Sequence, residues 1–346
     1  MTVVLVALAI ILAAALIWLA ALDGTFSVRR SSVIAVEPIQ AYDLVRDFHH
    51  WPAWSPWLIH EPDARLNFSS DPQEPQGWYS WDGKHIGAGK LTHEAMSAPT
   101  RDRPGRIEQR LSFTRPFRSS SRVVWDFSTV TSGSNGGVHG GVEVSWTMQG
   151  AMPFPLRFLA PMTARMITRD FDLGLARLKG VLDPAAAAPR IHFDGPSRFP
   201  SKTCITLPFE GDLDDIQQTM IDGFPRLAAQ RAALKAPQDE PAFTAYHKVL
   251  PDRPWFKGDL ATPIPEDADP GPFRAKTLGG EGDWFRVRLE GSYRFLEMTW
   301  HCAMAHLRMH KIRRDPRRSA FEVYESTPGD GDDGGAVTVL YIPIKS

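Results

Sequence analysis

A glutamate and a tyrosine near the carboxyl end have residue types and a spacing that suit cation binding or acid–base chemistry. They are Glu322 and Tyr324, in the strand-like run AFEVY at 320–324. Side chains two residues apart on a strand share one face of the sheet, so the carboxylate and the phenol would point the same way. In an apolar cleft the pair could attract a cation, with cation–π attraction adding roughly 0.5–2 kcal/mol. The competing interpretation is an exposed strand face on which a nearby arginine balances Glu322.

A second copy of this pattern indicates an internal repeat. Residues 242–246 read AFTAY, 78 positions before AFEVY, and TPI at 262–264 matches IPI at 342–344 at nearly the same offset. Two matches in the same order and at matching spacing support a duplication. The duplication places Thr244 and Tyr246 on the equivalent strand face of the first copy, so both are candidate ligand-binding residues.

Each copy also has an amphipathic helix before the repeated strand. The first helix begins near Asp212 and the second follows Ser292, with apolar residues at helical spacing in both. The expected half is therefore strand–helix–strand–strand, and two halves would pair around a pseudo-twofold axis with a cleft between them. Trp255, Trp284 and Trp300 are candidate walls of this cleft, although Trp300 lies on the apolar stripe of its helix and could equally belong to the core.

The amino end is an unbroken apolar segment at residues 3–22. About 20 such residues, rising about 1.5 Å each, cross the hydrocarbon core of a bilayer. We predict an uncleaved single-pass anchor of the bacterial inner-membrane type rather than a signal peptide, because only Met1 and Thr2 precede the segment. Arg29, Arg30 and Arg46 follow it, and the positive-inside rule then places the rest of the chain in the cytoplasm.

Length and composition predict two packed domains after this anchor. The chain has 346 residues, 43% of them hydrophobic, with 39 basic and 40 acidic side chains. The apolar fraction excludes a fully disordered chain, and the balanced charge argues against a nucleic-acid binder with a large basic surface. The stretch DPAAAAPR at 183–190 has no apolar periodicity and is typical of a linker. We therefore expect an anchor at 1–24, a first domain at 25–182 and a second domain at 191–346.

The first domain is predicted as an α+β fold, in which an antiparallel sheet curves around one long helix. A strand over 25–36 and a helix from Pro38 to about Arg46 come first, and an SGSNGG loop lies at 132–137 between later strands. Those strand-like runs are 77–81, 86–96, 106–113, 119–130 and 141–148, and helical spacing follows at 159–182. A cavity between sheet and helix is expected. Trp54 and Trp57, in HHWPAWSPW, could edge it, or could belong to a packed loop that covers the mouth of the sheet.

No metal or cofactor is predicted. His306 and His310 have the i, i+4 spacing of a metal pair but lack the HExxH context, and Cys204 and Cys302 lie far apart. The dinucleotide and phosphate-loop motifs are absent, and no Ser-His-Asp group is recognisable. The basic run at 308–318 is typical of a solvated helix end, with a nucleic-acid or anionic-lipid contact as alternatives.

Residues 25–182 resemble START-like, or polyketide cyclase, domains of the helix-grip type. The resemblance rests on the opening VRRSSVIAVEPIQAYDLVRDFHHWPAWSPW, the strand entry at Gly87–Gly89 and the closing RDFDLGLARLKG. It implies a cavity for an apolar ligand, and only some members of the superfamily are enzymes.

Residues 191–346 resemble GyrI-like, or transcription-activator effector-binding, domains. The resemblance rests on the duplicated halves, the Gly279-Gly280 strand entry, LEGSY at 289–293, FEVYES and the ending VTVLYIPIK. It implies a cleft for hydrophobic and often cationic small molecules, with the glutamate of a Y-E-x-Y motif in the pocket. Here Glu322 matches that glutamate, but Phe321 replaces the first tyrosine, which puts an acid–base role for that position in doubt.

The leading hypothesis is a membrane-anchored protein with two small-molecule-binding modules, for an apolar ligand and for a hydrophobic, possibly cationic one. The alternative is a hydrolase or cyclase that acts on hydrophobic substrates, with Glu322 as general acid or base and Tyr324 or Tyr246 assisting. A third hypothesis is a structural role in which both interiors are closed. No nucleic-acid partner is expected.

Overall fold

The computed structural model describes residues 2–130, 141–183, 185–186, 188–236, 240–249, 255–326 and 335–345. The chain divides into two compact units, Met1–Ala188 and Pro189–Ser346. Each unit contains one antiparallel sheet with helices, which confirms the predicted α+β class. The SGSNGG loop predicted at 132–137 lies outside the described residues.

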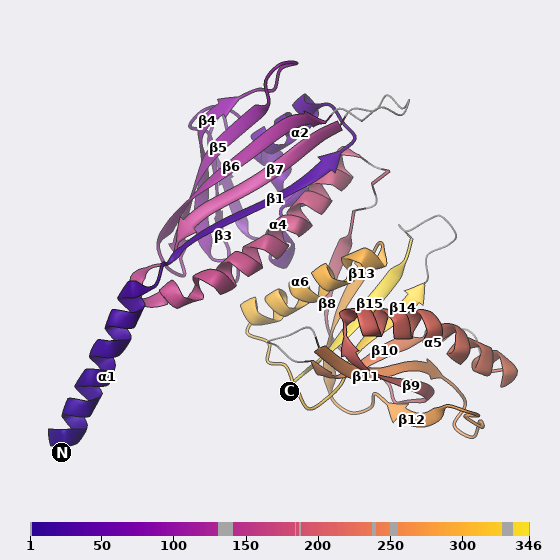
Figure 1. Cartoon of the computed structure of the whole chain (residues 1–346). Coiled ribbons are helices and arrows are strands. Elements are labelled where there is room, and N and C mark those ends of the chain that lie inside the picture. The colour runs from indigo at the N-terminus through magenta and orange to yellow at the C-terminus, as the bar shows by residue number, and fades with distance from the viewer. Residues whose placement is uncertain are drawn as a thin grey trace. The chain divides into compact units, whose positions relative to one another are not determined.

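The first unit begins with α1 (Thr2–Ala21) and continues into a seven-stranded sheet of order β1-β7-β6-β5-β4-β3-β2 (Figure 1). The strands are β1 (Thr25–Ile34), β2 (Arg65–Phe68), β3 (Trp78–Asp82), β4 (Ala88–Ser97), β5 (Gly105–Arg115), β6 (Ser119–Val130) and β7 (Gly141–Ala151). Five short helical segments complete it: α2 (Pro38–Arg46), η1 (Phe48–His50), α3 (Trp51–Trp54), η2 (Leu58–His60) and η3 (Phe154–Leu159). The sequence predicted every strand except β2, an edge strand of only four residues.

The long helix α4 (Ala160–Leu182) packs its apolar side chains against this sheet, as predicted. Its Phe171 ring stacks on Trp146 of β7 with the ring centres 3.9 Å apart. Leu175 and Leu178 of the same helix are buried in the same core. Burial of this stripe, at roughly 25 cal/mol per Å² of apolar surface, fixes the helix on the sheet.

The second unit contains an eight-stranded sheet of order β12-β9-β11-β10-β14-β15-β13-β8. Its strands are β8 (Arg190–Ser197), β9 (Lys202–Asp212), β10 (Phe243–Val249), β11 (Trp255–Pro263), β12 (Arg274–Leu278), β13 (Asp283–Glu290), β14 (Ala320–Ser326) and β15 (Val337–Ile344). The helices are α5 (Leu213–Ala233) and, after the short turn η4 (Tyr293–Phe295), α6 (Leu296–Met309). The predicted strand–helix–strand–strand halves are confirmed as β9-α5-β10-β11 and β13-α6-β14-β15.

The structure adds one strand to each half, and the two added strands are exchanged. Strand β8 precedes the first half but pairs with β13, while β12 precedes the second half but pairs with β9. The two halves also have equivalent dipeptides before their helices. Gly211-Asp212 precedes α5, and Gly291-Ser292 precedes η4, which leads into α6. The Asp212 carboxylate accepts hydrogen bonds from two backbone N–H groups of the first turn of α5, and the Ser292 hydroxyl accepts one from the backbone N–H of Arg294 in η4.

Candidate functional site

Glu322 lies at the centre of the second sheet, on the face that both helices cover. Cross-strand pairing aligns Leu260, Thr244, Glu322 and Leu340 in one row across β11, β10, β14 and β15. Paired residues share a face, so all four side chains point the same way. Leu260 packs in the cluster that contains α5 residues, and Leu340 in the cluster that contains α6 residues. Glu322 therefore lies between the two helices.

The Glu322 carboxylate is buried, with 3% of the residue exposed. The Trp300 indole donates a 2.7 Å hydrogen bond from Nε1 to Glu322 Oε2, and the Tyr324 hydroxyl donates one of 2.7 Å to Oε1. The Thr244 hydroxyl lies 2.8 Å from the Tyr324 hydroxyl. Because the single proton of Tyr324 points to Glu322, the Thr244 hydroxyl donates to the phenol oxygen. The result is a continuous chain from Thr244 through Tyr324 to Glu322.

Burial has a clear electrostatic effect on this group. It raises the pKa of Glu322 above the usual range, and the hydrogen bonds from Trp300 and Tyr324 oppose that rise only in part. Burial and the negative charge of Glu322 also raise the pKa of Tyr246 and Tyr324 well above the usual range, so both phenols remain protonated donors. The two described hydrogen bonds to the carboxylate come from neutral groups.

Aromatic rings surround this chain of polar groups. Tyr246 meets Trp300 edge-on at 5.9 Å, as the predicted face requires. Phe224 of α5 and Tyr293 of η4 each contact Tyr324 edge-on, at 5.4 and 5.7 Å. No local pattern in the sequence marks Phe224 and Tyr293 as site residues, because their approach to β14 depends on how the helices pack. Glu322 itself is buried, whereas Tyr246, Trp300 and Tyr324 around it are each partly exposed.

Trp255 and Trp284 do not join this group, which corrects the prediction that they wall the same cleft. Trp284 belongs to the cluster that contains Phe321, whose side chain points to the opposite face from Glu322. Its indole donates to the backbone oxygen of Ser319, and the Arg318 guanidinium lies 4.6 Å from its ring centre. Trp255 alternates with Phe256, which packs on the α5 side, so Trp255 also points to the opposite face.

In the first unit, Trp54 lies in the packed core and Trp57 at its edge. Trp54 is fully buried against Trp51, Trp125 and Trp146, with ring centres 4.5 to 5.9 Å away. Trp57 is half-buried, and its Nε1 donates a 3.1 Å hydrogen bond to the carboxylate of Asp170. The Nε1 groups of Trp54 and Trp146 are buried without a hydrogen-bond partner. An unpaired buried donor costs about 1–3 kcal/mol, so both groups would gain from an acceptor.

A second polar cluster lies on the face of the second sheet opposite Glu322. Asp259 is fully buried, and its Oδ2 lies 2.6 Å from both His247 Nε2 and Lys276 Nζ. His247 Nδ1 lies 2.7 Å from the Ser319 hydroxyl. Burial alone would raise the pKa of Asp259, but the bonds from His247 and Lys276 hold it below its usual value. The cluster therefore combines a Ser319–His247–Asp259 hydrogen-bonded series with an ion pair, in which Lys276 neutralises the Asp259 carboxylate.

The described residues contain no group of three or more histidine, cysteine, aspartate or glutamate side chains arranged to hold a metal ion. The rings of His306 and His310 stack face to face with centres 3.9 Å apart. Two pockets lie away from Glu322. One, of about 160 Å³, is lined by residues of the α1–β1 junction and Arg157, and the other, of about 450 Å³, by residues that include Glu281, Asp315 and Arg318.

Comparison with known proteins bears on the first unit. Residues 25–183 match the family model described as "Polyketide cyclase / dehydrase and lipid transport". The resemblance predicted for residues 25–182 is confirmed. No curated protein matches the chain.

Several solved structures are similar to part of the chain. The structure of SAV2435 bound to tetraphenylphosphonium is 15% identical, with a TM-score of 0.35 over 45% of this chain and 94% of that one. The EcmrR C-terminal domain is 13% identical, with a TM-score of 0.37 over 46% and 98%. A putative transcription regulation protein from Staphylococcus aureus is 14% identical, with a TM-score of 0.33 over 45% and 99%. At this similarity the ligands of those proteins do not transfer to this chain.

One helix among the described residues is long and apolar enough to cross a membrane. It is α1, in which the window Val4–Ala21 has a mean hydropathy of 2.9 and no buried share. A signal sequence near an amino end would have the same properties.

Proposed function

We propose that this chain is a single-pass membrane-anchored protein whose second domain binds a hydrophobic cation and whose first domain binds an apolar ligand. One observation carries the proposal: the Glu322 carboxylate is buried among aromatic rings, and its described hydrogen bonds come only from neutral donors. A buried carboxylate without a positive partner is unfavourable, and a bound cation would relieve it. The surrounding rings favour a cation that carries apolar groups.

The anchor supports a ligand that partitions into membranes. Residues 3–22 contain no charged side chain, so α1 could remain in the bilayer after synthesis. A protein held there would meet lipophilic compounds at the concentration they reach in the lipid. The cytoplasmic location of both domains, which rests on the arginines after α1, is part of the same proposal.

The first domain would bind a mainly apolar molecule that carries a hydrogen-bond acceptor. The stacked rings of Trp125, Trp146 and Phe171 lie in its core. The unpaired Nε1 groups of Trp54 and Trp146 lie among these rings and would donate to a carbonyl or hydroxyl oxygen of the ligand.

The test uses the full chain in detergent or nanodiscs with tetraphenylphosphonium, which combines a permanent positive charge with aromatic rings, and with triphenylphosphine oxide as a neutral counterpart. Glu322→Gln should weaken binding of the cation at least about tenfold, or about 1.4 kcal/mol, and leave the neutral compound almost unaffected. Glu325→Gln is the matched control, because Glu325 is exposed and points to the other face of the same strand. Equal affinity of the wild type and Glu322→Gln for the cation would contradict the proposal.

The enzyme alternative also has a specific observation in its favour. A carboxyl with a raised pKa, joined through a phenol to the Thr244 hydroxyl, can take up or release a proton. If this chemistry occurs, Glu322→Gln will abolish hydrolysis of hydrophobic ester or epoxide substrates while the neutral probe still binds. Turnover that persists in the variant would remove Glu322 from any catalytic role.

A further inference from the structure

Exposed apolar side chains gather at one end of the first domain. Three of the 19 phenylalanines are exposed, namely Phe117, Phe154 and Phe158, at 43, 44 and 50%. Met162, at the start of α4, is 53% exposed. Soluble domains rarely collect large apolar side chains in this way without a partner for them.

Strand register places all four at the end where α1 joins the domain. Thr25 of β1 pairs with Ala151 of β7, and Gly150 of β7 pairs with Ser121 of β6. The β5–β6 turn that carries Phe117 and the η3 segment that follows β7 therefore lie at the same end of the strands, which is called the anchor-side edge of the first domain. Only residues 22–24 separate α1 from β1, so the end of one lies at most about 14 Å from the start of the other. The end of α1 therefore stays close to this end of the first domain at any tilt of α1.

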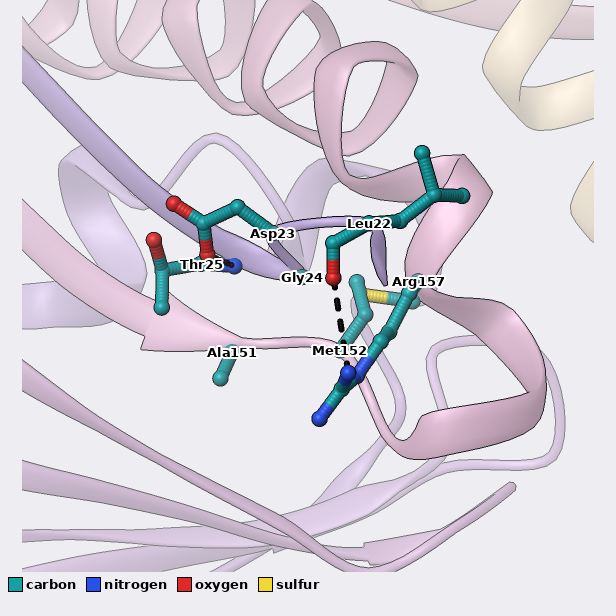
Figure 2. A pocket seen from close by; sticks show the side chains of 7 residues that line it. All are labelled: Leu22, Asp23, Gly24, Thr25, Ala151, Met152 and Arg157. Carbon is teal, nitrogen blue, oxygen red and sulfur yellow. Dashed lines mark hydrogen bonds between the residues drawn. The ribbon is translucent and has the colours of Figure 1, made fainter. Parts of the chain in front are cut away.

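Arg157 of η3 ties this edge to the end of α1. Its Nη1 donates to the backbone oxygen of Ala20, at 3.1 Å. It also donates to the backbone oxygen of Leu22, at 3.4 Å, as Figure 2 shows. Gly24 makes room for it, since a Cβ there would lie 2.6 Å from Arg157 Cγ. The guanidinium lies 5.3 Å from the Phe154 ring centre. An arginine that hydrogen-bonds the last carbonyls of a helix suits the boundary between lipid and water.

Along α4, with increasing distance from α1, an exposed apolar side chain is followed by two cationic ones. Met162, Arg165 and Arg169 follow one another at helical spacing, and all three are exposed. At about 1.5 Å per residue, the two arginines lie about 4.5 and 10 Å beyond Met162 along the axis. Apolar side chains nearest the anchor, followed by cations, match the order of acyl chains and phosphates in a bilayer.

We infer that Phe117, Phe154, Phe158 and Met162 insert into the interfacial layer of the membrane that α1 crosses, with Arg165 at the level of the lipid phosphates. This inference rests on the proposed anchorage and adds a second membrane contact to it. The contact fixes which end of the first domain faces the lipid, and it holds the start of α4 at the bilayer surface. A protein partner fits less well, because the short junction leaves little depth between this edge and the lipid.

The inference is tested on the full chain in nanodiscs whose lipids carry bromine on their acyl chains. Single cysteines replace Phe158 or Phe117 and carry a polarity-sensitive fluorophore; native Cys204 and Cys302 are buried. Ile39→Cys and Val181→Cys are matched controls, because these residues are 43 and 44% exposed, but Ile39 follows the far end of β1 and Val181 lies in the last turn of α4. Leu16→Cys reports on α1 itself.

Labels at 158 and 117 should lose fluorescence in brominated lipid as the label at 16 does, while labels at 39 and 181 keep theirs. Quenching at 16 but not at 158 and 117 would overturn the interfacial contact and leave the anchor intact. No quenching at 16 would instead show that the anchorage has failed, and with it the basis of this inference. Protection of 158 from water-soluble quenchers without lipid quenching would indicate a protein contact and would also overturn it.

Discussion

Thr244 and Glu322 lie directly opposite each other on β10 and β14, where the two halves of the second domain meet. They are also equivalent positions of the repeat, so the pseudo-twofold axis passes between them. One half therefore supplies a hydroxyl at the axis and the other a carboxylate. The consequence is a single negative charge at the centre of the domain, where strict symmetry would have placed two.

Thr244→Glu would restore that symmetry and should destabilise the domain. Side chains that pair directly across two strands have Cβ atoms about 4.5–5.5 Å apart, so two buried carboxylates would repel each other. We expect a loss of about 1–3 kcal/mol near neutral pH that diminishes in acid, where one carboxyl becomes protonated. Urea unfolding at several pH values measures this. Thr244→Gln is the matched control, and an equal loss in both variants would show that size rather than charge is responsible.

The raised pKa of Glu322 predicts that the stability of the second domain depends on pH. Between the usual glutamate pKa and the raised one, the folded state binds more protons than the unfolded state. The free energy of unfolding should therefore fall as pH rises through that window and stay lower above it. Glu322→Gln does not titrate, so its stability relative to the wild type should increase with pH. A difference that stays constant with pH would show that Glu322 has its ordinary pKa.

The affinity for a cation should depend on the same protonation of Glu322, but it should rise with pH where the stability falls. The carboxylate form binds the cation, so the affinity for tetraphenylphosphonium should rise with pH and level off above the raised pKa. Below that pKa, each pH unit lowers the affinity by up to about tenfold. Calorimetry in buffers of different ionisation enthalpy would detect the proton released on binding, which Glu322→Gln should not release.

The part of this site that the sequence predicted depends on local geometry. Alternation along a strand places Glu322 and Tyr324 on one face, and the repeat extends that face to Thr244 and Tyr246. The errors concern relationships across strands. Trp255 and Trp284 do lie on strands of the second sheet. Which face of that sheet each side chain occupies relative to Glu322 depends on the pairing register, which a single sequence does not reveal.

Long-range pairing also explains what the sequence missed in the fold. The exchange of β8 and β12 between the halves joins segments about 70–100 residues apart, and no local pattern specifies such a partner. The tryptophan-rich segment of the first domain was correctly selected as unusual. That Trp51 and Trp54 are packed deep in the core follows from ring contacts with β6 and β7 rather than from the segment itself.

Pro225 interrupts the hydrogen bonding of α5 beside Phe224, whose ring covers Tyr324. A proline inside a helix removes one N–H donor and costs about 3 kcal/mol relative to alanine. If α5 opens here to admit a ligand, Pro225→Ala should raise stability and slow the association of tetraphenylphosphonium, as stopped-flow fluorescence would show. Higher stability with an unchanged association rate would mean that the ligand enters elsewhere.

His93 should make the first domain sensitive to mild acid. Its side chain is fully buried and its Nε2 lies 2.9 Å from the backbone oxygen of Arg46, and burial lowers its pKa to about 4. Between about pH 6.5 and that value the unfolded state binds more protons, so the free energy of unfolding falls as pH falls, by about 3 kcal/mol over the window. His93→Gln keeps a donor for Arg46 and cannot titrate, so this variant should lose less stability in acid when unfolding is followed by tryptophan fluorescence. His50→Gln, at an exposed position of the same domain, should lose as much as the wild type. If the His93 variant and the wild type have parallel pH profiles, His93 is not the group responsible.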